Sequence, residues 1–154
     1  MEEIIKVFAL AILAYLTGAI PSSVWLGKWL YQTDVRKHGS GNAGASNTMR
    51  VFGIKTGVIV LIIDIFKGWL TVRYVDIFNL FPFNGEMQIN ISILFGVLAV
   101  TGHIFPVFAG FNGGKGVATV FGVMFSIHPL ATLCGGGVFL LVLLVSKIFS
   151  LSSM

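Results

Sequence analysis

The sequence predicts an all-α integral membrane protein with about five transmembrane helices joined by short polar loops. Of the 154 residues, 56% are hydrophobic and only 10% are charged, and the mean hydropathy is +0.93. A soluble domain usually carries far more charge than this. Several apolar runs approach the ~20 residues that cross the hydrocarbon core of a bilayer. We therefore expect a single polytopic membrane domain over residues 1–154.

The first apolar run covers residues 4–20 and ends at Pro21. A cleavable signal peptide would begin with basic residues, whereas this segment begins with Glu2 and Glu3. We therefore expect a retained transmembrane helix. Residues 24–33 are amphipathic and contain two tryptophans, which favours a position at the membrane–water interface.

The second predicted span, residues 51–75, contains two opposite charges inside an otherwise apolar segment, Asp64 and Lys67. Residues three apart lie on the same face of a helix. A lone charge at the centre of a bilayer costs on the order of 2.5–3.5 kcal/mol, so the two are expected to form an ion pair. A purely structural pair and a pair with a function are both compatible with this pattern.

The rest of the chain predicts three more spans separated by turn signals. Residues 76–90 contain Pro82 and Asn84-Gly85, which are typical of a connection. Pro129 is suited to open the last helix, where its missing N–H costs nothing. Three consecutive glycines in that helix, residues 135–137, favour close helix packing. The expected helices are residues 91–107, 117–127 and 129–149.

Residues 39–50, written GSGNAGASNTMR, form a polar segment between two apolar runs. Glycines let the backbone turn its N–H groups into one concavity. The hydroxyl and amide side chains add short donors, and Arg50 adds a planar cation suited to phosphate. This composition predicts an anion-binding loop, with a plain solvated loop as the alternative.

A second glycine-rich turn, residues 108–116, leads directly into a predicted helix. Free N–H groups and the positive end of the helix dipole favour phosphate at such a position, and Lys115 adds a full charge. The GGKG sequence resembles part of a P-loop, but the spacing GxxxxGK[ST] is absent, which disfavours a nucleotide site. A third small polar cluster covers residues 150–153.

With five spans, all three polar clusters fall on the same side of the membrane. Positively charged loops are cytoplasmic, which places the clusters in the cytoplasm and the N-terminus outside. Clustering at helix ends also explains the net charge of +4 without a nucleic-acid partner. The basic residues on the cluster side are Lys28, Arg36, Lys37, Arg50, Lys55, Lys115 and Lys147.

At this point the sequence resembles a known family. Residues 40–50 resemble the first signature, SGNxGATNxxR, of the bacterial acyl-phosphate-dependent glycerol-3-phosphate acyltransferases, the PlsY family. Residues 64–68, 102–106 and 113–119 match that family in order and spacing, and residues 150–153 resemble the start of its third signature. Ser46 replaces the usual threonine and keeps a hydroxyl.

The resemblance implies transfer of a fatty acyl group from acyl phosphate to the 1-hydroxyl of sn-glycerol 3-phosphate. The products would be lysophosphatidate and phosphate, in the first step of phospholipid biosynthesis at the bacterial inner membrane. Acyl phosphate is a mixed anhydride with a good leaving group, so positioning and charge neutralisation matter most. We expect no cofactor and no metal.

Family members add a C-terminal helical hairpin, so we expect this chain, which ends at Met154, to be C-terminally truncated.

The resemblance also implies which motif residues bind phosphate and substrate, whereas the individual roles that follow are our own hypothesis. Ser40, Arg50 and Lys115 are expected to neutralise phosphate charge, and His103 to orient substrate or relay a proton, although a lone histidine at a helix end is more often structural. The expected substrate-binding residues are Gly41, Asn42, Gly44, Asn47, Asn112, Gly113, Gly114, Gly116, Ser152 and Ser153.

Two other classes of protein remain as alternatives, a small transporter or channel for phosphorylated solutes and a non-catalytic membrane scaffold. Glycine-interrupted basic helices and an intramembrane ion pair suit a transporter. However, the sequence shows no inverted repeat, and its polar clusters lie on one face rather than at the midplane. The sequence indicates neither an acyl-chain preference nor an oligomeric state.

Overall fold

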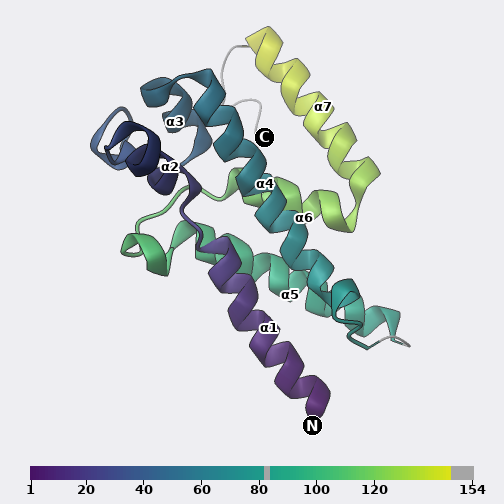
Figure 1. Ribbon diagram of the computed structural model, residues 1–154. Coiled ribbons are helices and arrows are strands. Elements are labelled where there is room, and N and C mark those ends of the chain that lie inside the picture. The colour runs from purple at the N-terminus through teal and green to yellow at the C-terminus, as the bar shows by residue number, and fades with distance from the viewer. Residues whose placement is uncertain (82–83, 147–154) are drawn as a thin grey trace.

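The computed structural model describes residues 1–81 and 84–146, with side chains to residue 138. The described residues form helices joined by short segments, with no strand among them (Figure 1). In chain order the elements are α1 (Glu2–Gly18), α2 (Ser22–Tyr31), η1 (Val35–Lys37), α3 (Ala45–Phe52), α4 (Ile54–Ile77), α5 (Gly85–Ile104), η2 (Val107–Ala109), α6 (Val117–Ile127) and α7 (Pro129–Ser146).

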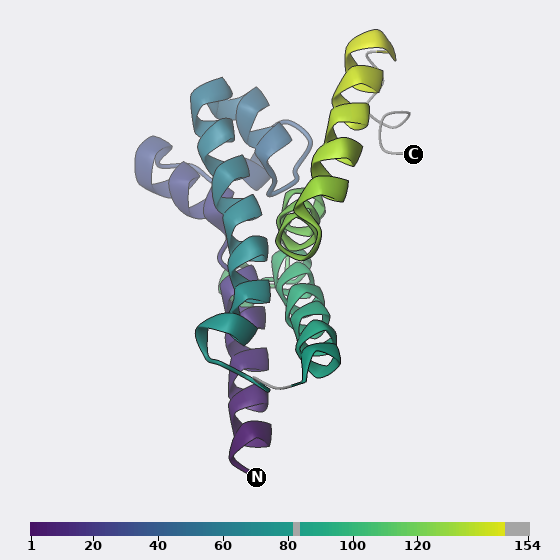
Figure 2. The same ribbon diagram turned by 90° about the vertical axis from the view of Figure 1, so that its right-hand side faces the viewer.

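Helix α4 is the centre of the assembly and packs against α1, α2, α3, α5 and α6. Helices α1 and α5 also pack against each other, and α7 contacts α6. Figure 2 shows an elongated molecule, with the N-terminus at one end and α7 extending away from α4 toward the other. The polar segments that follow α2 and α5 both lie near the α3 side of this arrangement (Figure 1).

Glycines allow the helices to approach closely. A Cβ atom at Gly122 of α6 would overlap the backbone carbonyl of Ile65 in α4, and one at Gly68 would overlap that of Thr119. Gly18 and Gly102 play the same part where α1 meets α5. Small residues of this kind are typical of helix contacts within membranes, where backbones pack directly.

The distribution of burial differs from that in a water-soluble protein. Large apolar side chains such as Phe8, Ile62 and Leu130 are 70%, 60% and 77% exposed. Meanwhile Asp64 and Lys67 are buried at the centre of α4. An exposed apolar surface of this extent around a polar interior fits a protein whose outer surface faces lipid.

By length and composition, the segment Gly85–Ala109 could cross a membrane, and α1 with α2 could do so as a pair bent by 44°. Helix α4 carries five charged residues along its 24-residue length, and α6 has only 11 residues. Within the described ranges these are the candidates, so a total of five crossings stays a prediction.

The sequence-based boundary of the third span was wrong. Helix α5 begins at Gly85, inside the segment that was expected to be a connection. The side chain of Asn84 accepts a hydrogen bond from the backbone N–H of Met87, at 3.0 Å. Asn84-Gly85 therefore starts a helix with an N-cap, a role for which asparagine is as well suited as for a turn.

The expected polar loop over residues 39–50 is also half helical. Helix α3 begins at Ala45 and ends at Phe52, and Gly53 then adopts a φ of 90°. This left-handed conformation favours glycine and breaks the chain between α3 and α4, so the second span begins at Ile54. The boundaries predicted for residues 117–127 and for Pro129 are confirmed.

The glycine run in α7 was expected to allow close helix packing. Of these three glycines, only Gly136 has a near neighbour among the described residues, the ring of Phe121. A Cβ at Gly135 or Gly137 would meet no described atom within 4 Å. Close packing is thus seen at Gly136 and stays a prediction at the other two glycines.

Candidate functional site

The ion pair predicted within α4 is confirmed and forms the centre of a buried polar network. The Lys67 Nζ lies 3.0 Å from Asp64 Oδ1, and the two side chains are 4% and 1% exposed. Ser22 donates its hydroxyl to the same carboxylate oxygen at 2.8 Å, and Lys67 donates to the carbonyl of Ile20 at 3.0 Å. The break between α1 and α2, at Pro21, thus supplies two of the partners that this pair needs in a low-dielectric site.

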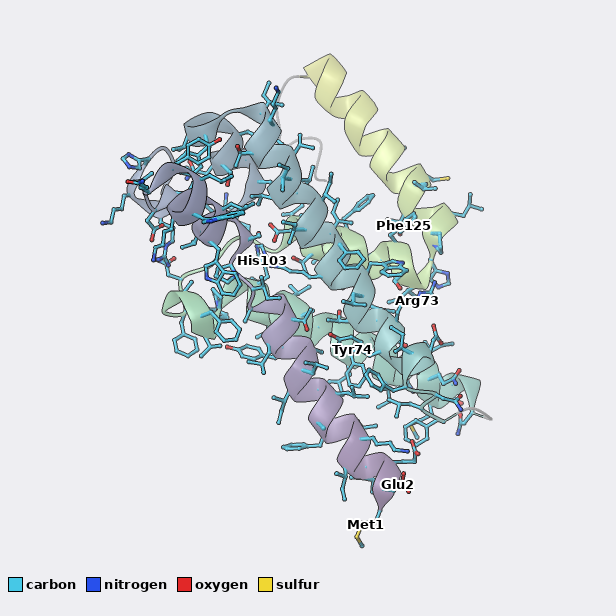
Figure 3. The ribbon with its side chains drawn as sticks, in the orientation of Figure 1. Met1, Glu2, Arg73, Tyr74, His103 and Phe125 are labelled. Carbon is cyan, nitrogen blue, oxygen red and sulfur yellow. The ribbon has the colours of Figure 1, made fainter. Side chains whose placement is uncertain are left out.

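His103 joins this network from α5. Its Nδ1 lies 3.7 Å from Asp64 Oδ1, and its side chain is 6% exposed. A cavity of about 10 Å³, lined in part by Lys67 and His103, lies between this network and the glycine turn, with room for about one water molecule. Figure 3 shows His103 near the point where α1 passes into α2.

The glycine turn, residues 113–116, is fixed to α5 by its first two backbone amides. Gly113 donates its N–H to the carbonyl of Ile104, and Gly114 donates to that of His103, each at 3.2 Å. These two amides are therefore occupied within the protein. Gly116 adopts a left-handed φ of 79° and starts α6, so the amides from Lys115 onward are the ones placed at a helix N-terminus, where anions bind.

Asn47 holds the first glycine-rich segment in shape. Its amide nitrogen donates to the carbonyls of Val35, His38 and Asn42 at 3.0–3.1 Å. Its side-chain oxygen accepts the N–H of Ser40 at 2.8 Å, and the residue is 2% exposed. These contacts use the whole amide, so the geometry gives Asn47 an organising role within the loop.

The residues expected to neutralise phosphate charge all lie at the surface. Ser40, Arg50 and Lys115 are exposed, as is Asn112, while Asn42 is partly buried. The left-handed conformations of Gly39 and Gly41, with φ of 60° and 73°, turn the backbone around Ser40. The remaining predicted residues, Ser152 and Ser153, lie outside the described residues.

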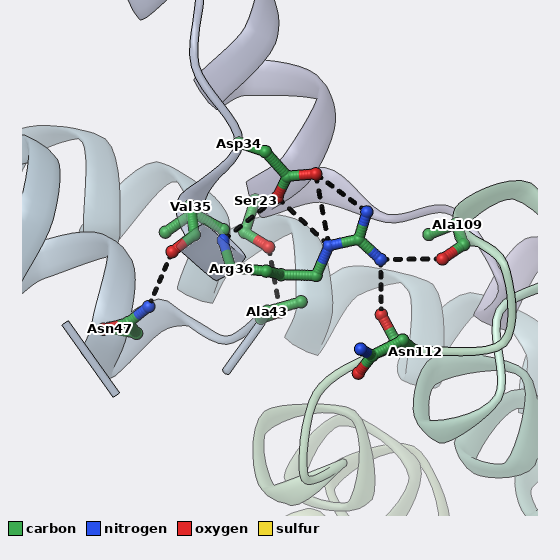
Figure 4. A network of polar contacts seen from close by, with 8 residues as sticks. All are labelled: Ser23, Asp34, Val35, Arg36, Ala43, Asn47, Ala109 and Asn112. Carbon is green, nitrogen blue, oxygen red and sulfur yellow. Dashed lines mark hydrogen bonds and ion pairs between the residues drawn. The ribbon is translucent and has the colours of Figure 1, made fainter. Parts of the chain in front are cut away.

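Arg36 brings the two glycine-rich segments together. From the sequence it was predicted only as one of the basic residues on the cytoplasmic side. Its guanidinium donates to the carbonyl of Ala109 at 2.7 Å and to that of Asn112 at 3.0 Å, as Figure 4 shows. Residues far apart in sequence thus meet at one place. In addition, Gly114 lies close to the carbonyl of Ala43.

Asp34 fixes the Arg36 side chain from the other side. Its carboxylate lies 2.8 Å from the Arg36 Nη2 and accepts the backbone N–H of Arg36 at 3.0 Å. These contacts lower the pKa of Asp34 below its usual range and raise the pKa of Arg36. At neutral pH the pair is therefore fully charged. Asp34 followed by Arg36 two positions later was the one signal of this pair in the sequence.

An apolar groove of about 300 Å³ lies beside the polar network. It is lined by residues of α2 together with Ile20 and Ile63. Ile20 and Ser22 line both this groove and the small cavity at Lys67 and His103. The groove and the small cavity therefore adjoin each other at these two residues.

The described residues contain no group of three or more His, Cys, Asp or Glu side chains that could hold a metal ion. Of the titratable groups that meet here, Asp64 and Lys67 pair with each other and with Ser22 and the carbonyl of Ile20, whereas the His103 ring lies 3.7 Å from the Asp64 carboxylate. The polar groups near this site are hydroxyl, amide, ammonium and guanidinium groups, together with the imidazole of His103 at the small cavity.

The sequence is similar to those of known glycerol-3-phosphate acyltransferases. A family model for glycerol-3-phosphate acyltransferase matches residues 8–154. A glycerol-3-phosphate acyltransferase from Listeria welshimeri is 45% identical over 152 residues, which cover 97% of this chain and 73% of that protein. One from Streptococcus pneumoniae (strain Taiwan19F-14) is 46% identical over 144 residues, which cover 94% of this chain and 64% of that protein.

The fold is likewise similar to solved structures. A crystal structure of PlsY (YgiH), an integral membrane glycerol 3-phosphate acyltransferase, in its glycerol 3-phosphate form superposes with a TM-score of 0.84. The sequences are 38% identical, and the match covers 96% of this chain and 70% of that one. Its lysophosphatidic acid form gives a TM-score of 0.81 at 36% identity. The chain belongs to the glycerol-3-phosphate acyltransferase (PlsY) family of integral membrane proteins.

Proposed function

We propose that this protein transfers a fatty acyl group from acyl phosphate to the 1-hydroxyl of sn-glycerol 3-phosphate, at the cytoplasmic face of the bacterial inner membrane. The observation that carries the proposal is the meeting of two glycine-rich segments, residues 39–44 and 110–116, through Arg36. Exposed hydroxyl and cationic groups lie on these segments and on the helices that follow them. Membership of the family supplies the acceptor, glycerol 3-phosphate.

The proposed reaction needs two phosphate groups to be held and their charge neutralised. Arg50 and Lys115 would supply the cations, and Ser40 and the amides at the start of α6 would supply neutral donors. The 1-hydroxyl oxygen attacks the acyl carbonyl carbon, the bond from that carbon to the phosphate oxygen breaks, and inorganic phosphate leaves. The hydroxyl proton passes to a substrate phosphate, so the protein supplies positioning and electrostatic stabilisation.

The apolar groove beside the network supports a lipid-like donor. It is lined almost entirely by apolar groups and shares Ile20 and Ser22 with the polar cavity. An acyl phosphate has an apolar tail joined directly to a charged head, so it needs adjoining surfaces of these two kinds. The acyl chain of the donor would lie along α2, with its carbonyl toward the glycine turn.

The proposed orientation places the N-terminus outside. Helix α1 begins with Glu2 and Glu3, which Lys6 pairs at 2.8 and 3.2 Å. Several basic residues lie on or beside the two glycine-rich segments, including Lys37, Arg50 and Lys115, and the five predicted spans put them on the opposite side of the membrane from the N-terminus. The positive-inside rule then favours a cytoplasmic active site.

The test of this proposal is acyl transfer by the purified protein, and Arg50→Ala and Lys115→Ala are the decisive variants. Each is expected to lower kcat/KM by roughly 10- to 150-fold, because each removes a charge-assisted contact worth ~1.5–3 kcal/mol. Release of inorganic phosphate from acyl phosphate, dependent on glycerol 3-phosphate, is the measurement. Arg73→Ala is the control, since Arg73 pairs with Asp76 near the C-terminal end of α4.

Turnover near that of the wild type in both variants would show that Arg50 and Lys115 do not take part in the site. A protein that forms no lysophosphatidate but carries phosphorylated solutes into liposomes would instead be a transporter. A protein that does neither would be a scaffold.

Asn47 offers a second test, because its contribution is structural. Asn47→Ala leaves the N–H of Ser40 and three carbonyls without their partner, and is expected to destabilise the protein by about 1–3 kcal/mol. Asn47→Asp keeps the acceptor for Ser40 but loses every donor, so it should also destabilise. Thermal unfolding in detergent is the measurement, with the exposed Asn90→Ala as control. An unchanged unfolding temperature in both Asn47 variants would contradict the organising role.

A further inference from the structure

Arg36 is held in one position by contacts on every side. Its Nη1 donates to the carbonyls of Ala109 and Asn112, its Nη2 donates to Asp34, and its Nε donates to the same carboxylate at 3.1 Å. A guanidinium has five N–H donors, and these contacts use four of them. Little of the group is left to bind a substrate, although it lies between two segments assigned to substrate binding.

The base of the Arg36 side chain is also rigid. Arg36 belongs to η1, whose first residue, Val35, is fully buried against Val24 and Ala43. The carbonyl of Val35 accepts a hydrogen bond from Asn47, and Ser23 donates to the carbonyl of Ala43 at 2.9 Å. Figure 4 shows these contacts in one view. Arg36 therefore extends from a well-packed support that directly precedes the first glycine-rich segment and is bonded to it.

The segment that Arg36 contacts needs support from outside itself. Between Ala109 and Asn112 the chain passes through two successive left-handed residues, Gly110 with φ of 65° and Phe111 with φ of 59°. A non-glycine residue in this region is strained and is kept there only by its surroundings. The two carbonyls that flank this pair are the ones that bind Arg36, and residues 113–116 follow directly.

We propose that Arg36, fixed by Asp34, is a positioning residue that holds the glycine turn at a set distance from the first glycine-rich segment, so that both bind one phosphate group. This inference rests on the proposed function, because it assumes that the two segments share an anion. It adds that the guanidinium acts through the carbonyls of Ala109 and Asn112 and has no contact with the substrate.

Kinetics of three variants test the proposal. Arg36→Met and Asp34→Asn are each expected to raise the KM for glycerol 3-phosphate about tenfold while changing kcat less, since loss of the clamp mainly weakens phosphate binding. Arg36→Lys should rescue only partly, because one ammonium lacks the fork that reaches a carboxylate and two carbonyls together. Lys37→Met removes the same charge from a neighbouring exposed residue and should leave the KM unchanged.

The Asp34→Asn variant separates positioning from direct binding, because it keeps the guanidinium charge. An Asp34→Asn protein with the wild-type KM, beside an Arg36→Met protein with a raised one, would overturn the positioning role and make Arg36 a substrate ligand. Wild-type KM values in both variants would also overturn it.

Hydrogen exchange with inorganic phosphate as the probe distinguishes this inference from the proposed function. In the wild type, phosphate should slow exchange in residues 39–44 and 110–116 together. In Arg36→Met, phosphate should protect only one of the two segments from exchange. The unfolding temperature of this variant should stay close to that of Lys37→Met. Joint protection that persists in Arg36→Met overturns the clamp, whereas absence of protection in the wild type overturns the shared phosphate site itself.

Discussion

Asp64→Asn is expected to destabilise the protein by about 3–5 kcal/mol, because it leaves the charge of Lys67 buried without a counter-charge. The same change replaces the charged acceptor of the Ser22 hydroxyl by a neutral amide oxygen and removes the negative charge that faces His103. Thermal unfolding of the detergent-solubilised protein is the measurement. The exposed pair Arg73 and Asp76 provides the control, since Asp76→Asn should cost at most about 1 kcal/mol.

The double variant Asp64→Leu with Lys67→Met completes this experiment. Replacing both members of a buried ion pair by apolar residues is often nearly neutral, so most of the lost stability should return. Losses that simply add in the double variant would mean that the two residues do not act as a pair. A double variant that folds without recovering acyl transfer would give the pair a function, the alternative that the sequence left open.

Gly122→Leu is expected to separate α6 from α4 and destabilise the protein by at least about 1–3 kcal/mol. The new Cβ would overlap the carbonyl of Ile65 and lie near the backbone nitrogen of Trp69. Backbone atoms of a packed helix have no room to shift aside. Because α6 begins two residues after Lys115, at Val117, the change should also lower acyl transfer, although Gly122 lies about one and a half turns from the start of the helix.

Gly135→Leu in α7 is the matched control, since a Cβ there meets no described atom within 4 Å. Unfolding temperature and acyl transfer are measured for both variants. Equal effects of the two substitutions would mean that helix propensity, and not the contact with α4, determines the result. A Gly122→Leu protein as stable as the wild type would contradict the close approach of α4 and α6.

Features that depend on local chemistry could be predicted from the sequence. The pairing of Asp64 with Lys67 follows from their spacing and from the cost of a lone charge in a bilayer. The start of α7 follows from Pro129, which restricts its own backbone. The glycine turn before α6 could be recognised because its residues are consecutive in the chain.

Features that depend on distant contacts could not be predicted in this way. The chain from Ala45 to Phe52 is polar at its start, yet it folds as α3 because Val51 and Phe52 pack against buried residues around Val24. The role of Arg36 depends on backbone carbonyls 73 and 76 residues away. A carbonyl is present at every residue, so no sequence pattern marks the two that Arg36 binds.

The break between α1 and α2 also has a consequence for how the protein enters its membrane during synthesis. The carbonyl of Ile20 and the hydroxyl of Ser22, which bind Lys67 and Asp64, precede α4 in the chain and leave the ribosome first. A helix with two central charges enters lipid poorly by itself, at a cost of ~2.5–3.5 kcal/mol per charge. We therefore expect helix α4 to insert together with the α1–α2 pair, because that earlier pair carries the groups that bind both charges.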